Sequence, residues 1–201
     1  DDIGLRALRH LAQDYLLAAN PLAHLDAAHS LCGRADNLTD RLAALRWITH
    51  YEVVEKREAV LADFYSRWQH EALVVNQWLT VQATRPDVDC VESVRALMTH
   101  PTFDWRNPNK LRALIGAFAG ANPIAFHRED GAGYRLMGEV IERLQASNPQ
   151  IAARMLAPMT RWRRYAVGQE AMRGELERLV AIDPLPKDVF EVVTKALEEP
   201  S

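Results

Sequence analysis

Apolar residues recur along nearly the whole chain with the spacing of an α-helix. Leu111, Leu114, Ile115 and Phe118 stand at positions i, i+3, i+4 and i+7. The same spacing recurs in four other segments, which contain Leu38, Leu42 and Leu45; Met137, Ile141 and Leu144; Met172, Leu176, Leu179 and Val180; and Val189, Val192, Val193, Ala196 and Leu197. Each set predicts one buried helix face. No segment alternates apolar and polar residues for long enough to predict a strand, so the pattern indicates an all-α protein.

Helix starts are marked by the dipeptide Asn-Pro, which occurs at Asn20, Asn107, Asn122 and Asn148. Asn is a favoured N-cap, and Pro fits the first helical position, where its missing N–H costs nothing. Two other pairs are expected to serve the same purpose: Asp36-Asn37 before residue 38, and Asp183-Pro184 before the last helix.

Many amphipathic helices joined by short loops favour antiparallel helix pairs stacked in a row over a four-helix bundle, which has fewer and longer helices. We therefore predict an ARM/HEAT-like α-solenoid that forms a single helical-repeat domain over residues 1–201. Gly116 is expected to allow close helix packing, and Gly120 to end a helix before the cap at Asn122.

The charge and the cysteine content limit the function classes. A formal net charge of −3 argues against a nucleic-acid partner, because phosphate backbones are bound by clustered Lys and Arg. The chain lacks a run of about 18 apolar residues, so we predict no membrane span. Its acidic start at Asp1-Asp2 has no signal-peptide pattern. Cys32 and Cys90 lie outside any CxxC spacing, which favours a reducing, cytoplasmic location.

One segment begins like the zinc-peptidase motif HExxH: His70-Glu71-Ala72-Leu73-Val74. That motif needs a second His one helical turn after the first, and Val74 occupies the position. We therefore predict no metal site here and expect His70 on the surface of a helix. No other segment has a nucleophile motif, so we predict no catalytic residue and no bound cofactor in these 201 residues.

Two polar clusters remain as candidates. The run Arg161-Trp162-Arg163-Arg164-Tyr165 is basic and aromatic, but its arginines are expected to complement the end of the helix that begins at Pro149, with the rings packed inside. Gln150 and Arg154 are four residues apart near the start of that helix and so share one face. They could hold a peptide carbonyl or carboxylate, or form an ordinary solvated face.

The stretch NPNKLRALIGAFAG at residues 107–120 closely resembles the C-terminal helical domain of the bacterial aminopeptidase N family. The segments at 36–45, 68–82 and 148–154 resemble that family in the same order, so the resemblance covers essentially the whole chain. It implies a zinc-dependent alanyl aminopeptidase whose zinc lies in a separate catalytic domain. Matched residue by residue, it implies that Gln150 stands near the pocket for the first substrate residue. Arg112 and Arg154 would then face the substrate channel.

The leading hypothesis is therefore an accessory domain that covers the active site, limits access and contacts peptide substrates. Its partners would be the catalytic domain of the same parent chain and the peptides. We expect this fragment alone to have no peptidase activity and to retain no stoichiometric zinc. The alternatives are a free-standing helical-repeat module that binds proteins or peptides, and a small independent hydrolase.

Overall fold

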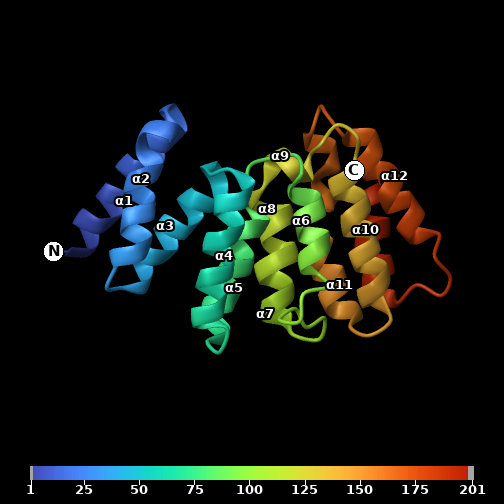
Figure 1. The fold of residues 1–201 in the computed structure, drawn as a ribbon. Coiled ribbons are helices and arrows are strands. Elements are labelled where there is room, and N and C mark those ends of the chain that lie inside the picture. The colour runs from blue at the N-terminus through green and yellow to red at the C-terminus, as the bar shows by residue number, and fades with distance from the viewer. Residues whose placement is uncertain (1, 199–201) are drawn as a thin grey trace. The chain divides into compact units, whose positions relative to one another are not determined.

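The computed structural model describes residues 2–198, and every regular element in that range is a helix (Figure 1). The all-α prediction is confirmed. The chain divides into two compact units, Asp1–Arg85 and Pro86–Ser201. None of the helices within the described range is long and apolar enough to cross a lipid bilayer.

The first unit contains five long helices. Its core lies where α1, α2 and α3 meet, and α3 also packs against α4 and α5. Trp47 and Ile48 of α3 fill this core together with Leu17 of α1. The helices are α1 (Asp2–Ala19), α2 (Pro21–Arg34), α3 (Leu38–Tyr51), α4 (Val54–Trp68) and α5 (Ala72–Ala83).

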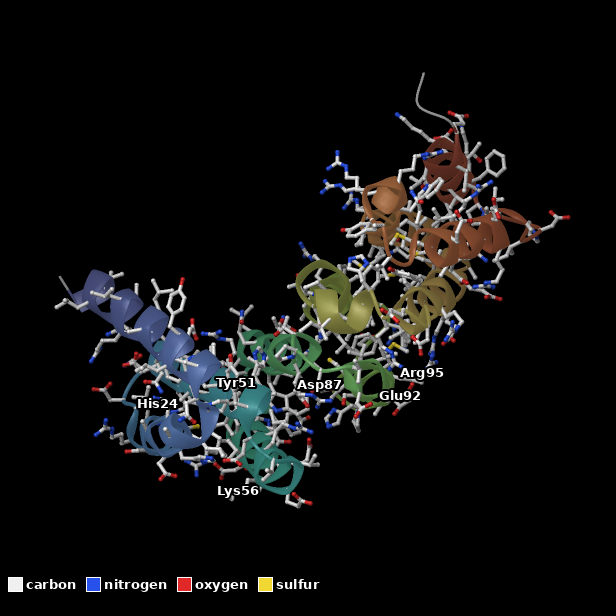
Figure 2. The ribbon with its side chains drawn as sticks, turned by 90° about the horizontal axis from the view of Figure 1, so that it is seen from above. His24, Tyr51, Lys56, Asp87, Glu92 and Arg95 are labelled. Atoms are coloured by element: carbon white, nitrogen blue, oxygen red, sulfur yellow. The ribbon has the colours of Figure 1, made fainter. Side chains whose placement is uncertain are left out.

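The second unit mixes long helices with very short ones. Its core centres on α10, which packs against α6, α9, α11 and α12. Glu92 and Arg95 lie one turn apart on α6, as Figure 2 shows, and form an ion pair of 3.8 Å. The elements are α6 (Cys90–Leu97), α7 (Pro108–Leu111), a π-helix (Arg112–Gly116), α8 (Ala117–Ala121), α9 (Pro123–Phe126), α10 (Ala132–Gln145), α11 (Pro149–Met155), a 3₁₀-helix (Met159–Arg164), α12 (Gln169–Val180) and α13 (Lys187–Leu197).

The predicted Asn-Pro starts are all confirmed. Helices α2, α7, α9 and α11 begin at the proline, and the side chain of the preceding asparagine accepts a hydrogen bond from a backbone N–H of the first turn. Asn37 caps α3 in the same way, at 2.9 Å from the amide of Asp40. The prediction for Asp183-Pro184 is wrong. Helix α13 begins only at Lys187, too far along the chain for Asp183 to cap it.

The helix expected over residues 108–121 has the predicted buried face but not a regular backbone. Leu111, Leu114, Ile115 and Phe118 are at most 1% exposed, which confirms the face. The five residues Arg112–Gly116 nevertheless form a π-helix, whose wider turn is a local feature that often accompanies functional sites. Gly120 does not end α8 as predicted: the helix continues to Ala121, and Asn122 both ends it and caps α9.

Candidate functional site

The site proposed from the sequence lies on two neighbouring elements, the π-helix and α11. Gly116 ends the π-helix, and a Cβ atom placed on it would lie 3.8 Å from both Arg112 Cβ and Met155 Cε. Arg112 therefore stands close to the C-terminal turn of α11, the helix that carries Gln150 and Arg154. The close packing predicted at Gly116 is confirmed. It joins two of the four segments through which the resemblance to aminopeptidase N was recognised.

The three predicted side chains, Arg112, Gln150 and Arg154, are all exposed. Arg112 is held by its own helix: its Nε donates to the carbonyl of Pro108 at 3.3 Å, and its Nη2 donates to Asn109 Oδ1 at 2.6 Å. Within the described range, the side chains of Gln150 and Arg154 make no hydrogen bond or ion pair. Their polar groups are thus free to meet a ligand, and contact with a substrate stays a prediction.

The segment around α11 is strongly basic, a feature that the sequence analysis missed. Residues 143–169 contain five arginines and no Asp or Glu, in a chain whose net charge is −3. The exposed side chains of Arg154, Arg161 and Arg164 have no carboxylate partner within the described residues. The sequence signal for this basic segment is the absence of Asp and Glu from residues 143–169, and not any single motif. An exposed arginine without a counter-ion favours binding of a carboxylate.

The other arginines of this segment have structural roles. Arg143 lies over the ring of Trp105, 4.0 Å from its centroid. Arg163 donates to three carbonyls at the end of α13, those of Ala196 at 2.7 Å, Leu197 at 2.9 Å and Glu198 at 2.7 Å. Arg163 thus neutralises the negative end of a helix dipole.

The helix that Arg163 complements is not the predicted one. Helix α11 ends at Met155, shortly before Pro158, which has no N–H to continue a helical ladder. The basic run therefore lies in a separate 3₁₀-helix, and the prediction that it forms the last turn of the Pro149 helix is wrong. The predicted packing of the tryptophan is confirmed, since Trp162 is 7% exposed and its Nε1 donates to the carbonyl of Ala196 at 2.9 Å.

Lys110, next to the π-helix, is a further positive group. It is buried in α7, and desolvation lowers the pKa of its ammonium group from the usual value. Burial also lowers the pKa of His100, and the nearby charge of Lys110 adds to that effect. The surroundings of the NPNKLR motif are therefore unfavourable for further cations.

The HExxH-like segment does not form a metal site. His70 is exposed in the turn between α4 and α5, so the prediction that it lies on a helix is wrong, although its surface position is confirmed. Val74 is a buried residue of α5, and it occupies the position where the motif needs its second zinc ligand. Across residues 2–198, no three His, Cys, Asp or Glu side chains come together as a metal-binding group.

A second polar cluster lies in the first unit, around a depression of about 200 Å³ lined by Arg9, His10, Asp40 and Trp47. His10 Nε2 and Asp40 Oδ1 are 2.7 Å apart. The hydrogen bond from Asn37, followed by that from His10, lowers the pKa of Asp40, while burial opposes them. The depression is smaller than a typical ligand pocket. We interpret these contacts as links between helices.

Over residues 1–198 the sequence matches a family described as a domain of unknown function (DUF3458_C) made of ARM repeats. The chain belongs to this family. ARM repeats are stacked helix pairs, so the predicted α-solenoid is confirmed. The family match and the division into two compact units leave the single domain over residues 1–201 a prediction.

Relatives within this ARM-repeat family carry an enzyme name. The chain is 44% identical over 198 residues to an aminopeptidase N of Haemophilus influenzae, and 40% identical over 199 residues to one of Escherichia coli. These alignments cover 98% of this chain but only 22% and 23% of the relatives. A crystal structure of Legionella pneumophila aminopeptidase A in complex with aspartic acid superposes with a TM-score of 0.89 at 32% identity, over 96% of this chain and 23% of that one. The predicted resemblance to the helical domain of bacterial aminopeptidase N is confirmed.

Proposed function

We propose that this chain is the C-terminal helical domain of a zinc metallo-aminopeptidase that removes N-terminal residues from peptides. The observation that carries the proposal is the exposed pair Gln150 and Arg154 on α11, next to Arg112, in a chain 44% identical to an aminopeptidase N. In this proposal the domain covers the active site, limits substrate access and contributes substrate contacts. Its partners are the catalytic domain of the same parent chain and the peptide substrates.

The chemistry of bond cleavage belongs to residues outside this chain. The only HExxH-like segment has Val74 in place of the second histidine, so the residues present do not fit a zinc site. Zinc, held by the catalytic domain, would polarise the scissile carbonyl and activate water. Cys32 and Cys90 form no disulfide within the described residues, which supports a cytoplasmic enzyme.

The role of this chain is to position the substrate. A guanidinium donates hydrogen bonds to a peptide carbonyl or carboxylate, and the bond is stronger where one partner is charged. Arg154 can do this because none of the carboxylates of the described residues competes for it. The basic segment around it would attract the acceptor groups of a peptide that extends beyond the bond being cut.

The test is Arg154→Ala in the longer parent enzyme. We expect a higher KM for peptides of three or more residues, through loss of a charge-assisted hydrogen bond worth roughly 1.5–3 kcal/mol if shielded and less if hydrated. A single-residue amide is too short to reach Arg154, so its kcat and KM should stay nearly unchanged. Steady-state kinetics on alanyl substrates of increasing length measure the difference.

The matched control is Arg106→Ala in the same unit. Arg106 is 90% exposed and lies 3.4 Å from Asp104, so its loss should not change KM at any substrate length. Equal losses of kcat on short and long substrates would move Arg154 to a role in chemistry or folding. A parent polypeptide without peptidase activity would contradict the proposal and favour a helical-repeat binding module.

A further inference from the structure

Helix α1 has its polar and apolar faces reversed relative to an ordinary surface helix. Among residues 3–19, whose side chains the structure describes, twelve are exposed, and Arg9 is the only charged one of these. The outer face of α1 follows the spacing i, i+3, i+7, i+10, i+11 and i+14, and it consists of Leu5, Leu8, Ala12, Tyr15, Leu16 and Ala19. Tyr15 is 71% exposed and Leu8 is 62% exposed. A stripe of this kind normally faces a protein core.

The inner face of α1 is the polar one. Asp14 accepts hydrogen bonds from Arg46 at 2.7 Å and from the indole of Trp47 at 2.5 Å. His10 and Arg6 both pair with Asp40, at 2.7 Å and 3.5 Å. Leu17 is the only residue of α1 that is buried among those described. These hydrogen bonds and ion pairs fix the side of α1 that faces α2 and α3. The apolar face of α1 is therefore held toward solvent.

Helix α13, the last helix of the other unit, has the polar outer face of an ordinary surface helix. Its exposed positions are Lys187, Asp188, Phe190, Glu191 and Lys195, of which four are charged. Terminal repeats of solenoid proteins carry such polar outer faces, because an apolar one would remain in water. Helix α1 has no such covering, and Figures 1 and 2 show it at the edge of its unit with its outer side uncovered by the other helices of that unit.

We propose that the outer face of α1 binds a further helix pair of the same ARM array, supplied by the part of the longer polypeptide that precedes Asp1. This rests on the proposed function only in taking the chain as part of a longer protein. The aminopeptidase relatives are longer proteins of this kind, since the chain covers only 22% of the Haemophilus influenzae protein. An ARM repeat presents an apolar helix face to its neighbour, and the spacing on α1 matches that face.

Other occupants fit the face less well. A helix that lies on a lipid surface needs several basic residues bordering its apolar stripe, but α1 offers only Arg9 among residues 3–19, because Arg6 is paired with Asp40. A second copy of the chain could bury the same face, but a helix pair in the same polypeptide binds at a higher effective concentration. Continuation of the array needs only the repeat geometry that the family already has.

The experiment compares three polypeptides: this chain, the chain extended on its N-terminal side by one repeat of about 40 residues, and the full parent. Each carries Leu8→Cys, and the rate of thiol alkylation is measured. Tyr15→Cys serves as a second variant on the same face. The native thiols give little background, because Cys90 is buried and burial raises the pKa of Cys32. Glu191→Cys, exposed on α13, is the matched control.

We expect one added repeat to slow alkylation at residues 8 and 15 by about tenfold or more, with no change at residue 191. Equal rates in this chain and the extended chain would overturn the proposal. Protection that is present only in the full parent would assign the face to another domain. Protection that is lost on dilution would assign it to a second copy, and protection that needs phosphatidylglycerol vesicles would assign it to a membrane; each of these results also overturns the proposal.

The same samples separate this inference from the proposed function. Peptidase activity of the full parent on an alanyl chromogenic substrate tests the enzyme, while alkylation tests the face of α1. A parent that is inactive but protected at residue 8 would refute the function and keep the helix contact. An active parent with unprotected residues 8 and 15 would do the reverse.

Discussion

The two units solve the same packing problem in different ways. In the unit Asp1–Arg85 the helices have 12 to 18 residues and are linked by polar side chains, such as Asp14 with Arg46 and His29 with Glu52. In the unit Pro86–Ser201 several elements have only 4 to 7 residues, and they meet where glycines allow close backbone approach and where aromatic rings pack edge to face.

The difference teaches where function can be built. Long helices with polar links present broad faces, such as the apolar one on α1, which suit the stacking of repeats. Short elements end often, so they direct individual side chains and backbone groups toward one place. The π-helix with Arg112 and the seven-residue α11 with Arg154 are both of this second kind. The candidate site therefore belongs to the irregular unit.

The largest expected effect tests the backbone contacts of that irregular unit. Gly133 starts α10 against α9, where a Cβ atom would lie 2.2 Å from the carbonyl oxygen and 2.7 Å from the Cα atom of Phe126. Because these are backbone atoms, no side-chain rotation relieves the clash. We expect Gly133→Ala to lower the free energy of unfolding by about 3 kcal/mol, as measured by denaturant unfolding.

Glycines in open positions provide the controls. Gly174 in α12 and Gly4 in α1 have no atom within 4 Å of an added Cβ, so alanine should stabilise each helix by up to about 1 kcal/mol. If Gly133→Ala unfolds at the same denaturant concentration as the unsubstituted 201-residue chain, the close approach of α9 and α10 is not needed for stability. The contrast between the units would then lose its main support.

The sequence predicted the regular parts of this molecule well because local chemistry determines them. An asparagine cap followed by proline needs only its own first turn, so all four Asn-Pro starts are confirmed. Apolar spacing likewise identified the buried face from Leu111 to Phe118 without any knowledge of its partners. Both signals act over a few residues.

The early end of α11 is a local effect, since Pro158 follows it closely. Two other failures depend on tertiary contacts. The placement of Arg163 on the carbonyls of α13 involves residues more than 30 positions apart. The reversed polarity of α1 follows from Asp40 and Arg46 in α3, which periodicity cannot assign to α1. For the site, spacing gave the shared face of Gln150 and Arg154. Only the structure showed that Arg112 lies beside that helix.

A smaller expected effect concerns the polar links of the regular unit. Burial, with a further contribution from the charge of Arg46, lowers the pKa of His50 to about 4. As the pH falls, His50 therefore becomes protonated at about pH 6.5 in the unfolded chain, but only at about pH 4 in the folded chain. The stability that this group contributes is complete above pH 6.5 and falls as the pH drops from 6.5 to about 4. The loss should be at most about 3 kcal/mol, and urea unfolding at several pH values measures it.

The variant His50→Gln removes the titrating group and keeps an amide that can donate to the carbonyl of Val81, 3.3 Å from His50 Nε2. The free energy of unfolding of this variant should change less between about pH 6.5 and about pH 4 than that of the unsubstituted chain. His127→Gln is the matched variant in the other unit, where burial also lowers the pKa of the histidine. An unchanged pH dependence in His50→Gln would mean that His50 has the same pKa in the folded and unfolded chains, which would contradict this prediction.

The smallest expected effect compares the same cap in the two units. Asn122 is 2% exposed, and its Oδ1 lies 3.2 Å from the amide of Ala125. Asn20 caps α2 in an exposed turn, with its Oδ1 3.4 Å from the amide of Ala23. Replacement by Ala removes the acceptor in both cases. Water can take its place at Asn20, whereas the buried amide of Ala125 is left without a partner.

We therefore expect Asn122→Ala to cost about 2 kcal/mol and Asn20→Ala about 0.5 kcal/mol. Asn20→Ser and Asn122→Ser keep a capping oxygen and should recover part of each loss, which separates the cap from other effects of shortening the side chain. Equal costs for the two alanine variants would show that burial does not distinguish these helix starts. The cap of α9 is shielded from water and that of α2 is not, so the difference of roughly 1.5 kcal/mol would measure what this shielding contributes.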